Sequence, residues 1–350
     1  MIRNLSFAKA INEAIDHTMK KDNKIILMGL GVDDPKGIFG TTLGLHKKYK
    51  NNVFDMPTSE NGFTGIGLGL AISGFKPIIV HQRVEFSLLT LEQIFNQISK
   101  WFYMSGGKVN VPMVIRLIIG KGWGQGPQHS QSLEAIFAHI PGLKVVCPSN
   151  AYDAKGLLQS SIKDPDPVIF FEHRWLHHTI SNVPKKNYSI KIGKSKIIKS
   201  GNDITLISFS LGVYECLKAI EYLKNQNKNI NIELIDLRSL TPIDRKAILK
   251  SAKKTKKVLI IDNGLIKNGI SAEISAIINE YLKEKIKTKR IGILDTPIPS
   301  SISIAKYCYT NYKDIVIEIL KMLSKDYKNL KFGKELNKSD QPDRNFIGPF

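Results

Sequence analysis

Short apolar segments alternate along this chain with longer segments of helical periodicity. The apolar segments include residues 24–29, 76–82 and 111–120 and, further on, 203–210 and 256–264. A strand with one face in water carries polar residues at every second position, and these segments mostly lack that alternation. Strands buried on both faces are typical of parallel sheets with helices on each side. The sequence therefore predicts an α/β fold.

The chain of 350 residues is long enough for two domains, each with its own core. Strand and helix patterns fill residues 1–180 and again residues 201–325. Residues 181–200 are polar and basic, which predicts a linker, and residues 326–350 form a polar tail. We therefore expect two parallel-sheet α/β domains.

Several classes of protein are excluded by composition. No apolar run approaches the roughly 20 residues of a membrane-spanning helix. Residues 1–16 have the pattern of an amphipathic helix rather than of a signal peptide, so we expect a cytoplasmic protein without membrane association. The three cysteines, Cys147, Cys216 and Cys308, are far apart, which predicts buried thiols rather than a disulfide or a zinc site.

The net charge of +20 comes almost entirely from lysine, since only eight residues are arginine. Nucleic-acid interfaces tend to use clustered arginine and interleaved aromatic residues. Here the lysines are dispersed along the chain, which predicts a solvated basic surface and no nucleic-acid partner. Such a surface can still speed the encounter with anionic molecules.

The segment DMPTSENGF, residues 55–63, places the carboxylate of Glu60 between an apolar strand and a glycine-rich run. Burying a carboxylate at this point is costly without a partner. The glycines at 65, 67 and 69 do not form a dinucleotide-binding motif, because Leu70 stands where that motif needs Gly or Ala. We interpret them as small residues that let a helix lie close to the sheet.

A second candidate site is the loop GKGWGQGPQHSQS, residues 120–132, which follows a predicted buried strand. Ligands of open α/β sheets bind at the carboxyl ends of the strands. His129 lies near the end of this loop, and the residues alone allow a catalytic or a structural role for it.

These motifs resemble the beta subunit of the decarboxylase component of 2-oxoacid dehydrogenases, which belongs to the transketolase-like thiamine diphosphate enzymes. Besides the segment at Glu60, the matching stretches are GIFGTTLGL (37–45), YMSGG (103–107), VPMVIR (111–116), PQHSQS (127–132) and IDLRSLTPID (235–244). The resemblance covers almost the whole chain, with the motifs in the same order. Pyruvate, branched-chain and acetoin dehydrogenases belong to this family. The resemblance implies oxidative decarboxylation of a 2-oxoacid, with acyl transfer to a lipoyl group.

The resemblance also implies roles for four residues. Glu60 matches the glutamate that bonds the pyrimidine ring nitrogen of thiamine diphosphate, and Phe86 matches the aromatic residue on the ring face. Gln82 matches a polar residue of the active site. His129 matches a histidine that transfers a proton or stabilises an oxyanion and then assists acyl transfer.

The Gly-Asp-Gly motif that holds Mg²⁺ and the diphosphate in thiamine enzymes is absent from the sequence. The resemblance therefore implies that an alpha subunit supplies both in an α₂β₂ enzyme, and that a lipoyl acyltransferase core is a further candidate partner. It also implies a K⁺ site, with an ordinary capped turn as the alternative. The carbonyls concerned lie near Met113, Ser161, Ile162, Asp164 and Asp166.

The chain departs from the family pattern at several positions. Leu30 replaces an acidic residue, Arg83 a smaller neutral one, and Trp123 lies in a loop of usually small residues. We predict that Arg83, Trp123 and Gln128 contact a substrate other than pyruvate. For Arg83 the alternative is a pair with Glu85 or with the partner subunit.

Two other functions remain open on the sequence. One is a transketolase-like carbon–carbon ligase that acts on an unusual sugar or ketoacid without a lipoyl partner. The other is a non-catalytic interaction subunit, against which the joint presence of Glu60, Phe86 and His129 argues.

Overall fold

The computed structural model describes residues 2–120 and 125–333, which divide into two compact units. Residues 2–120 and 136–192 form the first unit. Residues 125–135 and 193–333 form the second, so the segment that carries His129 belongs to the second unit although it follows a strand of the first. Trp123 and most of the polar tail lie outside the described residues.

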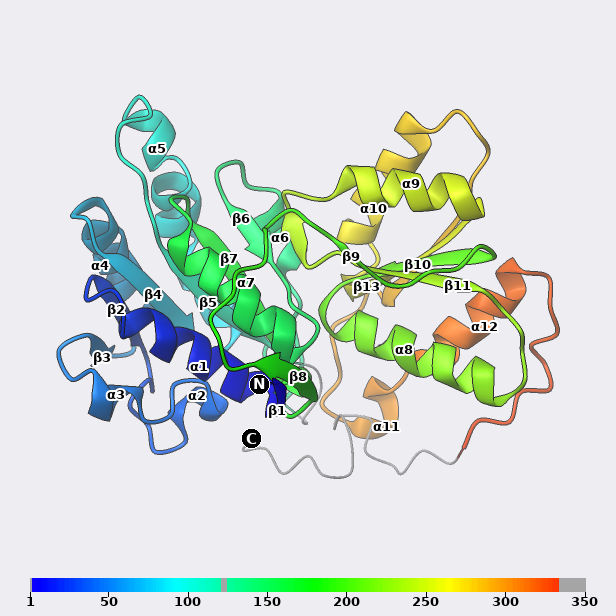
Figure 1. The fold of residues 1–350 in the computed structure, drawn as a ribbon, viewed down its shortest axis with the longest axis horizontal. Helices are drawn as coiled ribbons and strands as arrows, with labels where there is room; N and C mark the ends of the chain where they lie inside the picture. Colours follow the sequence, from blue (N-terminus) through cyan, green and yellow to red (C-terminus); the bar gives the residue numbers. More distant parts are fainter. Residues whose placement is uncertain (1, 121–124, 334–350) are drawn as a thin grey trace. The chain divides into compact units, whose positions relative to one another are not determined.

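A parallel sheet organises the first unit (Figure 1), and its strands in this unit run in the order β6-β7-β5-β4-β2-β3. Every neighbouring pair is parallel, so all carboxyl ends meet at one edge. The strands are β2 (Ile25–Gly29), β3 (Val53–Asp55), β4 (Lys76–His81), β5 (Val114–Ile119), β6 (Lys144–Val146) and β7 (Val168–His173).

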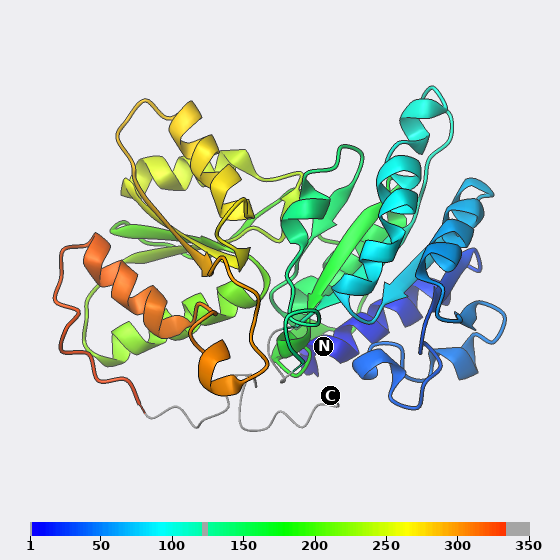
Figure 2. The ribbon, with the colours of Figure 1, turned by 180° about the vertical axis from the view of Figure 1, so that it is seen from behind.

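Helices cover both faces of this sheet, as the apolar strands require (Figures 1 and 2). On one face α1 (Phe7–Met19) lies beside α7 (Ala151–Lys163). On the other, α4 (Glu60–Ile72) is followed by η1 (Val84–Thr90) and η2 (Glu92–Ile98). The shorter helical elements are α2 (Gly37–Gly40), α3 (Leu45–Lys48), α5 (Trp101–Met104), α6 (Glu134–Ala138) and η3 (Arg174–Leu176).

The amino-terminal helix begins later than predicted. Residues Ile2–Ser6 form the strand β1, which pairs antiparallel with β8 (Ile180–Pro184). Helix α1 starts at Phe7, and the Ser6 hydroxyl accepts a hydrogen bond from the Lys9 amide at 3.3 Å, as an N-cap does. The prediction of a helix over residues 2–6 was wrong, because a partner strand far along the chain pairs with them.

One glycine of the run in α4, Gly67, lies close against the sheet. Gly67 is buried, and a Cβ atom added to it would lie 2.8 Å from Ile79 Cδ1 on β4. A larger residue at this position would force the side chain of Ile79 or the helix itself to shift. The structure thus supports close packing as the role of Gly67.

The second unit is built on a five-stranded sheet in the order β14-β13-β10-β11-β9, in which only β9 is antiparallel to its neighbour. The strands are β9 (Lys196–Lys199), β10 (Ile204–Ser208), β11 (Ile232–Asp236), β13 (Lys257–Leu265) and β14 (Lys287–Ile293), with a short β12 (Ser239–Thr241). Helices α8 (Ser210–Asn225) and α12 (Tyr312–Met322) cover one face, and α9 (Arg245–Thr255) and α10 (Ile270–Tyr281) cover the other (Figure 1). Helix α11 (Ile302–Ala305) lies between β14 and α12 in the chain.

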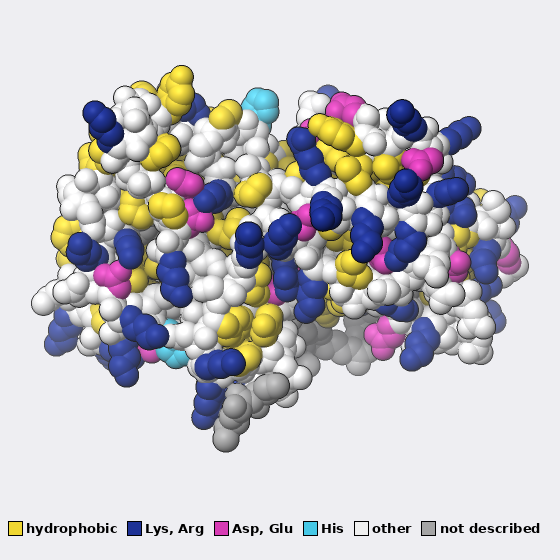
Figure 3. Space-filling model, turned by 45° about the horizontal axis from the view of Figure 1, so that its top comes forward, with side chains coloured by type: hydrophobic (Ala, Val, Ile, Leu, Met, Phe, Trp, Pro, Cys, Tyr) yellow, Lys and Arg dark blue, Asp and Glu magenta, His cyan; other side chains and the backbone are white. Residues whose placement is uncertain are grey.

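The surface and the cysteines agree with the predictions from composition. Lysine and arginine side chains are spread over the face shown in Figure 3, among acidic and apolar ones. Cys147, Cys216 and Cys308 are buried, and none of them forms a disulfide. Within residues 2–120 and 125–333, no helix has the length and apolar character needed to span a membrane.

Candidate active site

Polar groups gather at the carboxyl edge of the first sheet, where β2, β3 and β4 end side by side. Asp55 is the last residue of β3, and Glu60 follows it after a short turn. Gln82 directly follows β4. This edge is where open parallel sheets bind their ligands. The sequence-predicted residues Glu60 and Gln82 are therefore brought to the same edge.

Glu60 is the first residue of α4 and is only 6% exposed. The amino end of a helix carries partial positive charge, which favours a carboxylate there. Among the described residues, none donates a hydrogen bond to this carboxylate or forms an ion pair with it. Glu60 is thus a mostly buried residue whose carboxylate is still available to a polar group of a ligand.

The loop after β2 is held in place by Asp55 and Gln82. The Asp55 carboxylate accepts hydrogen bonds from the amides of Gly31 at 2.5 Å and Val32 at 3.1 Å. Gln82 donates through Nε2 to the carbonyl of Leu30 at 2.6 Å. Gly31 has a φ of +77°, and an added Cβ would lie 2.3 Å from Gln82 Nε2, so only glycine fits. Leu30 contributes its backbone here, where the family pattern has an acidic side chain.

Behind Glu60, His81 anchors α4 to the end of β4. Its ring stacks on Phe63 with the centroids 5.2 Å apart, and Nε2 lies 3.4 Å from Thr64 Oγ1. Burial lowers the pKa of His81 to about 3, so the ring stays neutral at physiological pH. His81 thus positions the helix that begins with Glu60. Sequence analysis did not single it out, because a lone histidine at a strand end carries no distinctive pattern.

Arg83 and Phe86 lie at the start of η1, just past the same strand end. Arg83 is partly buried in an extended conformation, and Phe86 is half-buried three residues later. Burial lowers the pKa of Arg83, while the charge of Glu85 acts in the opposite direction. Both residues are therefore placed near the edge that carries Gln82.

A buried ionic network crosses β5 and β7. The guanidinium of Arg116 donates to both carboxylate oxygens of Glu172, at 2.5 and 2.9 Å, and both side chains are fully buried. Burial alone would raise the pKa of Glu172, but the charge and hydrogen bonds of Arg116, together with the nearby His177 ring, hold that pKa below its ordinary value. Chiefly because of burial, the pKa of His177 falls to about 4. The Arg116–Glu172 pair is therefore a bidentate ion pair whose two charges offset each other within the core.

Arg174 follows β7 and was not predicted as a site residue. Its guanidinium lies 4.4 Å above the centre of the Phe39 ring, and Nη1 lies 3.2 Å from His178 Nε2. Burial lowers the pKa of Arg174 to about 10, and the nearby positive charge of Arg83 contributes to the shift. The only sequence signal that could have identified Arg174 is its position directly after the apolar run that forms β7.

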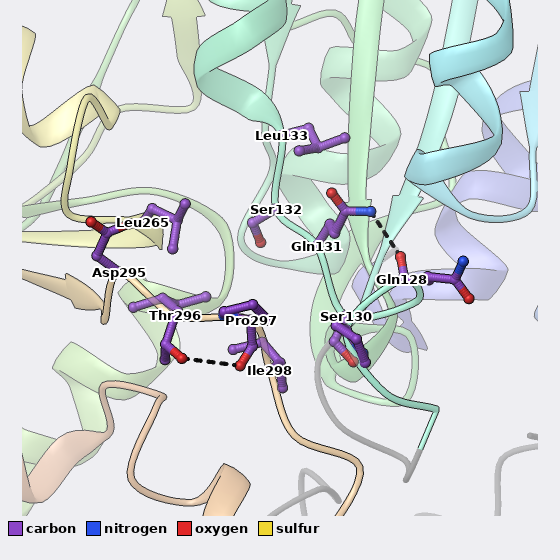
Figure 4. A pocket seen from close by; sticks show the side chains of 12 residues that line it. Gln128, Ser130, Gln131, Ser132, Leu133, Leu265, Asp295, Thr296, Pro297 and Ile298 are labelled. Carbon is purple, nitrogen blue, oxygen red and sulfur yellow. Dashed lines mark hydrogen bonds between the residues drawn. The ribbon is translucent and has the colours of Figure 1, made fainter.

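His129 and Gln128 lie in the second unit, on a loop that borders a cavity of about 490 Å³. Figure 4 shows Ser130 and Ser132 on one side of the cavity and Thr296, Pro297 and Ile298 opposite, with the amide of Gln128 turned away. The loop is braced by a bond from Gln131 Nε2 to the Gln128 carbonyl at 2.9 Å. His129 is half-buried and Gln128 is exposed.

The predicted K⁺ ligands lie at the turn between α7 and β7 and around the start of β5. Asp164 and Asp166 both pair with Lys144 Nζ, at 2.6 and 2.9 Å. The carbonyl of Ser161 accepts from the Asp164 amide at 3.2 Å, and that of Met113 accepts from the Val168 amide at 3.0 Å. Within the described residues no cluster of three or more His, Cys, Asp or Glu side chains could hold a metal ion. The ammonium group of Lys144 thus offsets the charges of Asp164 and Asp166. The K⁺ site stays a prediction.

Two family matches cover the chain in succession. Residues 3–178 match the family described as transketolase, pyrimidine binding domain, and residues 193–314 the one described as transketolase, C-terminal domain. The chain is also similar to a structure titled split gene transketolase, inactive beta4 tetramer, with a TM-score of 0.77 over 91% of this chain and 99% of that one. At 19% identity this similarity shows the fold alone. The predicted pair of α/β domains is confirmed.

Three relatives are similar over most of their length. The acetoin:2,6-dichlorophenolindophenol oxidoreductase subunit beta of Cupriavidus necator is 38% identical, over 86% of this chain and 92% of its own. Pyruvate dehydrogenase E1 component subunit beta-1 of Arabidopsis thaliana is 38% identical, over 90% and 88%. The 2-oxoisovalerate dehydrogenase subunit beta of Bacillus subtilis is 36% identical, over 88% and 95%. Their names refer to different substrates, so similarity alone does not select one for this chain.

Proposed function

Because the chain belongs to the beta subunits of 2-oxoacid dehydrogenase E1 components, within the transketolase-like enzymes, we propose that Glu60 is its activating carboxylate. In this proposal the enzyme decarboxylates a 2-oxoacid with thiamine diphosphate and transfers the acyl group to a lipoyl acceptor. The observation that carries the proposal is the position of Glu60, a mostly buried residue at the start of α4 whose carboxylate meets no donor among the described residues.

The residues at this edge fit the aminopyrimidine end of thiamine diphosphate. Glu60 would share a proton with a ring nitrogen, which is the polar partner that its carboxylate lacks in the described structure. Phe86 would lie against the flat ring, and Gln82 is already oriented by its bond to the Leu30 carbonyl. When bound, the cofactor supplies the carbanion chemistry of decarboxylation, and the protein supplies binding and orientation.

The chain lacks the means to hold the other end of the cofactor. No Gly-Asp-Gly motif occurs in its sequence, and no acidic cluster in the described residues is arranged to hold Mg²⁺. We therefore propose that an alpha subunit binds the diphosphate and Mg²⁺ in an α₂β₂ enzyme. We also propose that a lipoyl acyltransferase core accepts the acyl group. The same proposal includes a K⁺ ion at the turn after α7.

His129 is proposed to act after decarboxylation. The imidazole of a histidine can donate or accept a proton during acyl transfer. Its half-buried position on a braced loop would orient the imidazole while leaving one side of it accessible.

Activity of the reconstituted complex tests this function. The chain is co-expressed with its alpha subunit, and reduction of 2,6-dichlorophenolindophenol is followed with a set of 2-oxoacids, with and without thiamine diphosphate. We expect cofactor-dependent turnover that Glu60→Gln abolishes. Glu273→Gln is the matched control, because Glu273 lies in the first turn of α10 and is exposed. Turnover that survives Glu60→Gln would refute the role of Glu60.

A further inference from the structure

The cavity of about 490 Å³ in the second unit begins beside His129. Gln128 and Ser130, the neighbours of His129 in the chain, both line the cavity. Consecutive Cα atoms lie about 3.8 Å apart, so the backbone of His129 is at the cavity wall. The described lining residues all belong to the second unit, so the cavity is a feature of that unit. A molecule that reacts next to His129 can therefore extend into it.

The two walls of the cavity differ in polarity. On the wall formed by the His129 loop, Ser130, Gln131 and Ser132 bring hydroxyl and amide groups (Figure 4). The hydroxyl of Ser132 forms no hydrogen bond with another described residue, so it is available to a ligand. The apolar side chains of the lining are Leu133, Leu265, Ile293, Pro297 and Ile298. Mostly apolar walls with a few polar groups are typical of small-molecule sites.

The lining is almost free of charge. Asp295 is the one charged side chain among the described lining residues, and it pairs with Lys267 Nζ at 2.9 Å. Glu134 directly follows the lining residue Leu133, and burial raises its pKa to about 8, so it is protonated at neutral pH. Asp262, whose charge acts on Glu134, is buried and accepts hydrogen bonds from two backbone amides. Within the described lining no cation is present to hold an anionic group, and the cavity suits an uncharged one.

The size of the cavity exceeds what a small side chain needs. Its volume of about 490 Å³ lies within the range of about 300–1,000 Å³ that is typical of small-molecule sites. A methyl group is close in size to a water molecule, which takes up about 30 Å³ in the liquid. The methyl group of pyruvate would therefore leave most of this cavity without contacts.

We propose that the cavity receives the side chain of the 2-oxoacid and that the enzyme prefers acids whose side chain is long and uncharged. The proposal rests on the proposed function, in which His129 acts at the reacting carbon, and it names the substrate class. The reacting carbon would lie at His129, and the side chain attached to it would extend between the two walls. The side chain does not change during the reaction. Its burial therefore stabilises the bound substrate and the transition state alike and raises kcat/KM.

Substrate selectivity of the co-expressed complex is the test. The dichlorophenolindophenol assay compares pyruvate, 2-oxohexanoate and 2-oxohexanedioate. Each buried methylene strengthens binding about fourfold, so the three extra methylenes of 2-oxohexanoate are worth roughly 60-fold when fully buried. We expect kcat/KM for 2-oxohexanoate to exceed that for pyruvate by at least about tenfold. It should exceed that for 2-oxohexanedioate by a similar factor, because a second carboxylate would lose its water in the cavity without gaining a cation.

A variant that fills the cavity tests its role directly. Thr296 is an exposed residue of the wall opposite Ser132, so Thr296→Phe adds bulk to the cavity without changing the core. We expect the ratio of kcat/KM for 2-oxohexanoate to that for pyruvate to fall by at least about tenfold. Asn225→Phe is the control, because Asn225 is exposed at the end of α8 and does not line the cavity. If Thr296→Phe does not assemble, Leu265→Trp decides on the same ratio, since Leu265 is 42% exposed.

The outcomes separate this inference from the proposed function. A wild type that prefers pyruvate or the diacid would overturn the cavity as the side-chain site and leave the proposed function intact. An assembled Thr296→Phe complex with an unchanged ratio would do the same. An assembled wild type that turns over no 2-oxoacid would refute the proposed function and this inference together.

Discussion

Replacing Glu134 with glutamine should make the protein more stable at neutral pH and not at acid pH. Glu134 begins α6, is 2% exposed, and its Oε1 has no hydrogen-bond partner among the described residues. Burial raises the pKa of Glu134 from 4.5 to about 8, and the negative charge of Asp262 adds to the shift. The folded protein therefore keeps a proton on Glu134 at pH 7, and the unfolded chain does not.

The size of the effect follows from this difference in pKa. Between pH 4.5 and about 8 the folded state binds one more proton than the unfolded state at this site. The free energy of unfolding then falls by about 1.4 kcal/mol per pH unit as the pH rises. Near pH 4.5 the loss is small, and by pH 7 it reaches roughly 3 kcal/mol. Glutamine has nearly the same shape and no proton to lose, so Glu134→Gln removes this pH dependence.

Urea unfolding at several pH values between 5 and 8 measures the effect. The difference in unfolding free energy between Glu134→Gln and wild type should grow steadily with pH across this range. Glu273→Gln, an exposed glutamate of the second unit, should show no such growth. A difference for Glu134→Gln that stays constant with pH would refute the inference that this side chain is buried in its protonated form.

Three further predictions concern the cofactor, the histidine and the packing of α4. Calorimetry of the isolated chain with thiamine diphosphate and Mg²⁺ should show little heat, and micromolar binding without an alpha subunit would contradict the shared site. In the complex, His129→Ala should lower turnover by about 10²- to 10⁴-fold, and near-normal turnover would return His129 to a structural role. Gly67→Ala should destabilise the protein by about 1–3 kcal/mol, because its Cβ would lie 2.8 Å from Ile79 Cδ1. Gly69→Ala, with nothing within 4 Å, is the control in the same helix, and equal effects of the two changes would refute the packing argument.

The sheets were predictable because apolar periodicity is a local property of the chain. Residues 88–106 have helical periodicity with Leu88, Leu91 and Ile94 on one face, which on its own predicts a single helix with Leu88 buried. The structure instead has η1, then the π-helical η2 and the short α5, and Leu88 is 37% exposed. A π-helical turn holds more residues than an α-helical turn, so it shifts the buried face along the chain. Strand β1 escaped prediction because its partner β8 lies far away in sequence.

For the candidate site, too, the sequence could locate residues placed by local features and not those placed by long-range contacts. The location of Glu60, Gln82 and Phe86 at the carboxyl edge of the sheet could be predicted, because each follows closely on a strand end. Arg174 reaches the charge of Arg83 only through the order of the strands, which no local pattern reveals.

The most direct test of the account is exchange of the thiazolium C2 proton of thiamine diphosphate in the complex of this chain with its alpha subunit. If Glu60 activates the cofactor, exchange should be fast in the wild type and in His129→Ala. It should be slower by orders of magnitude in Glu60→Gln, with cofactor binding and folding retained. Exchange as fast in Glu60→Gln as in the wild type would show that Glu60 is not the activating carboxylate.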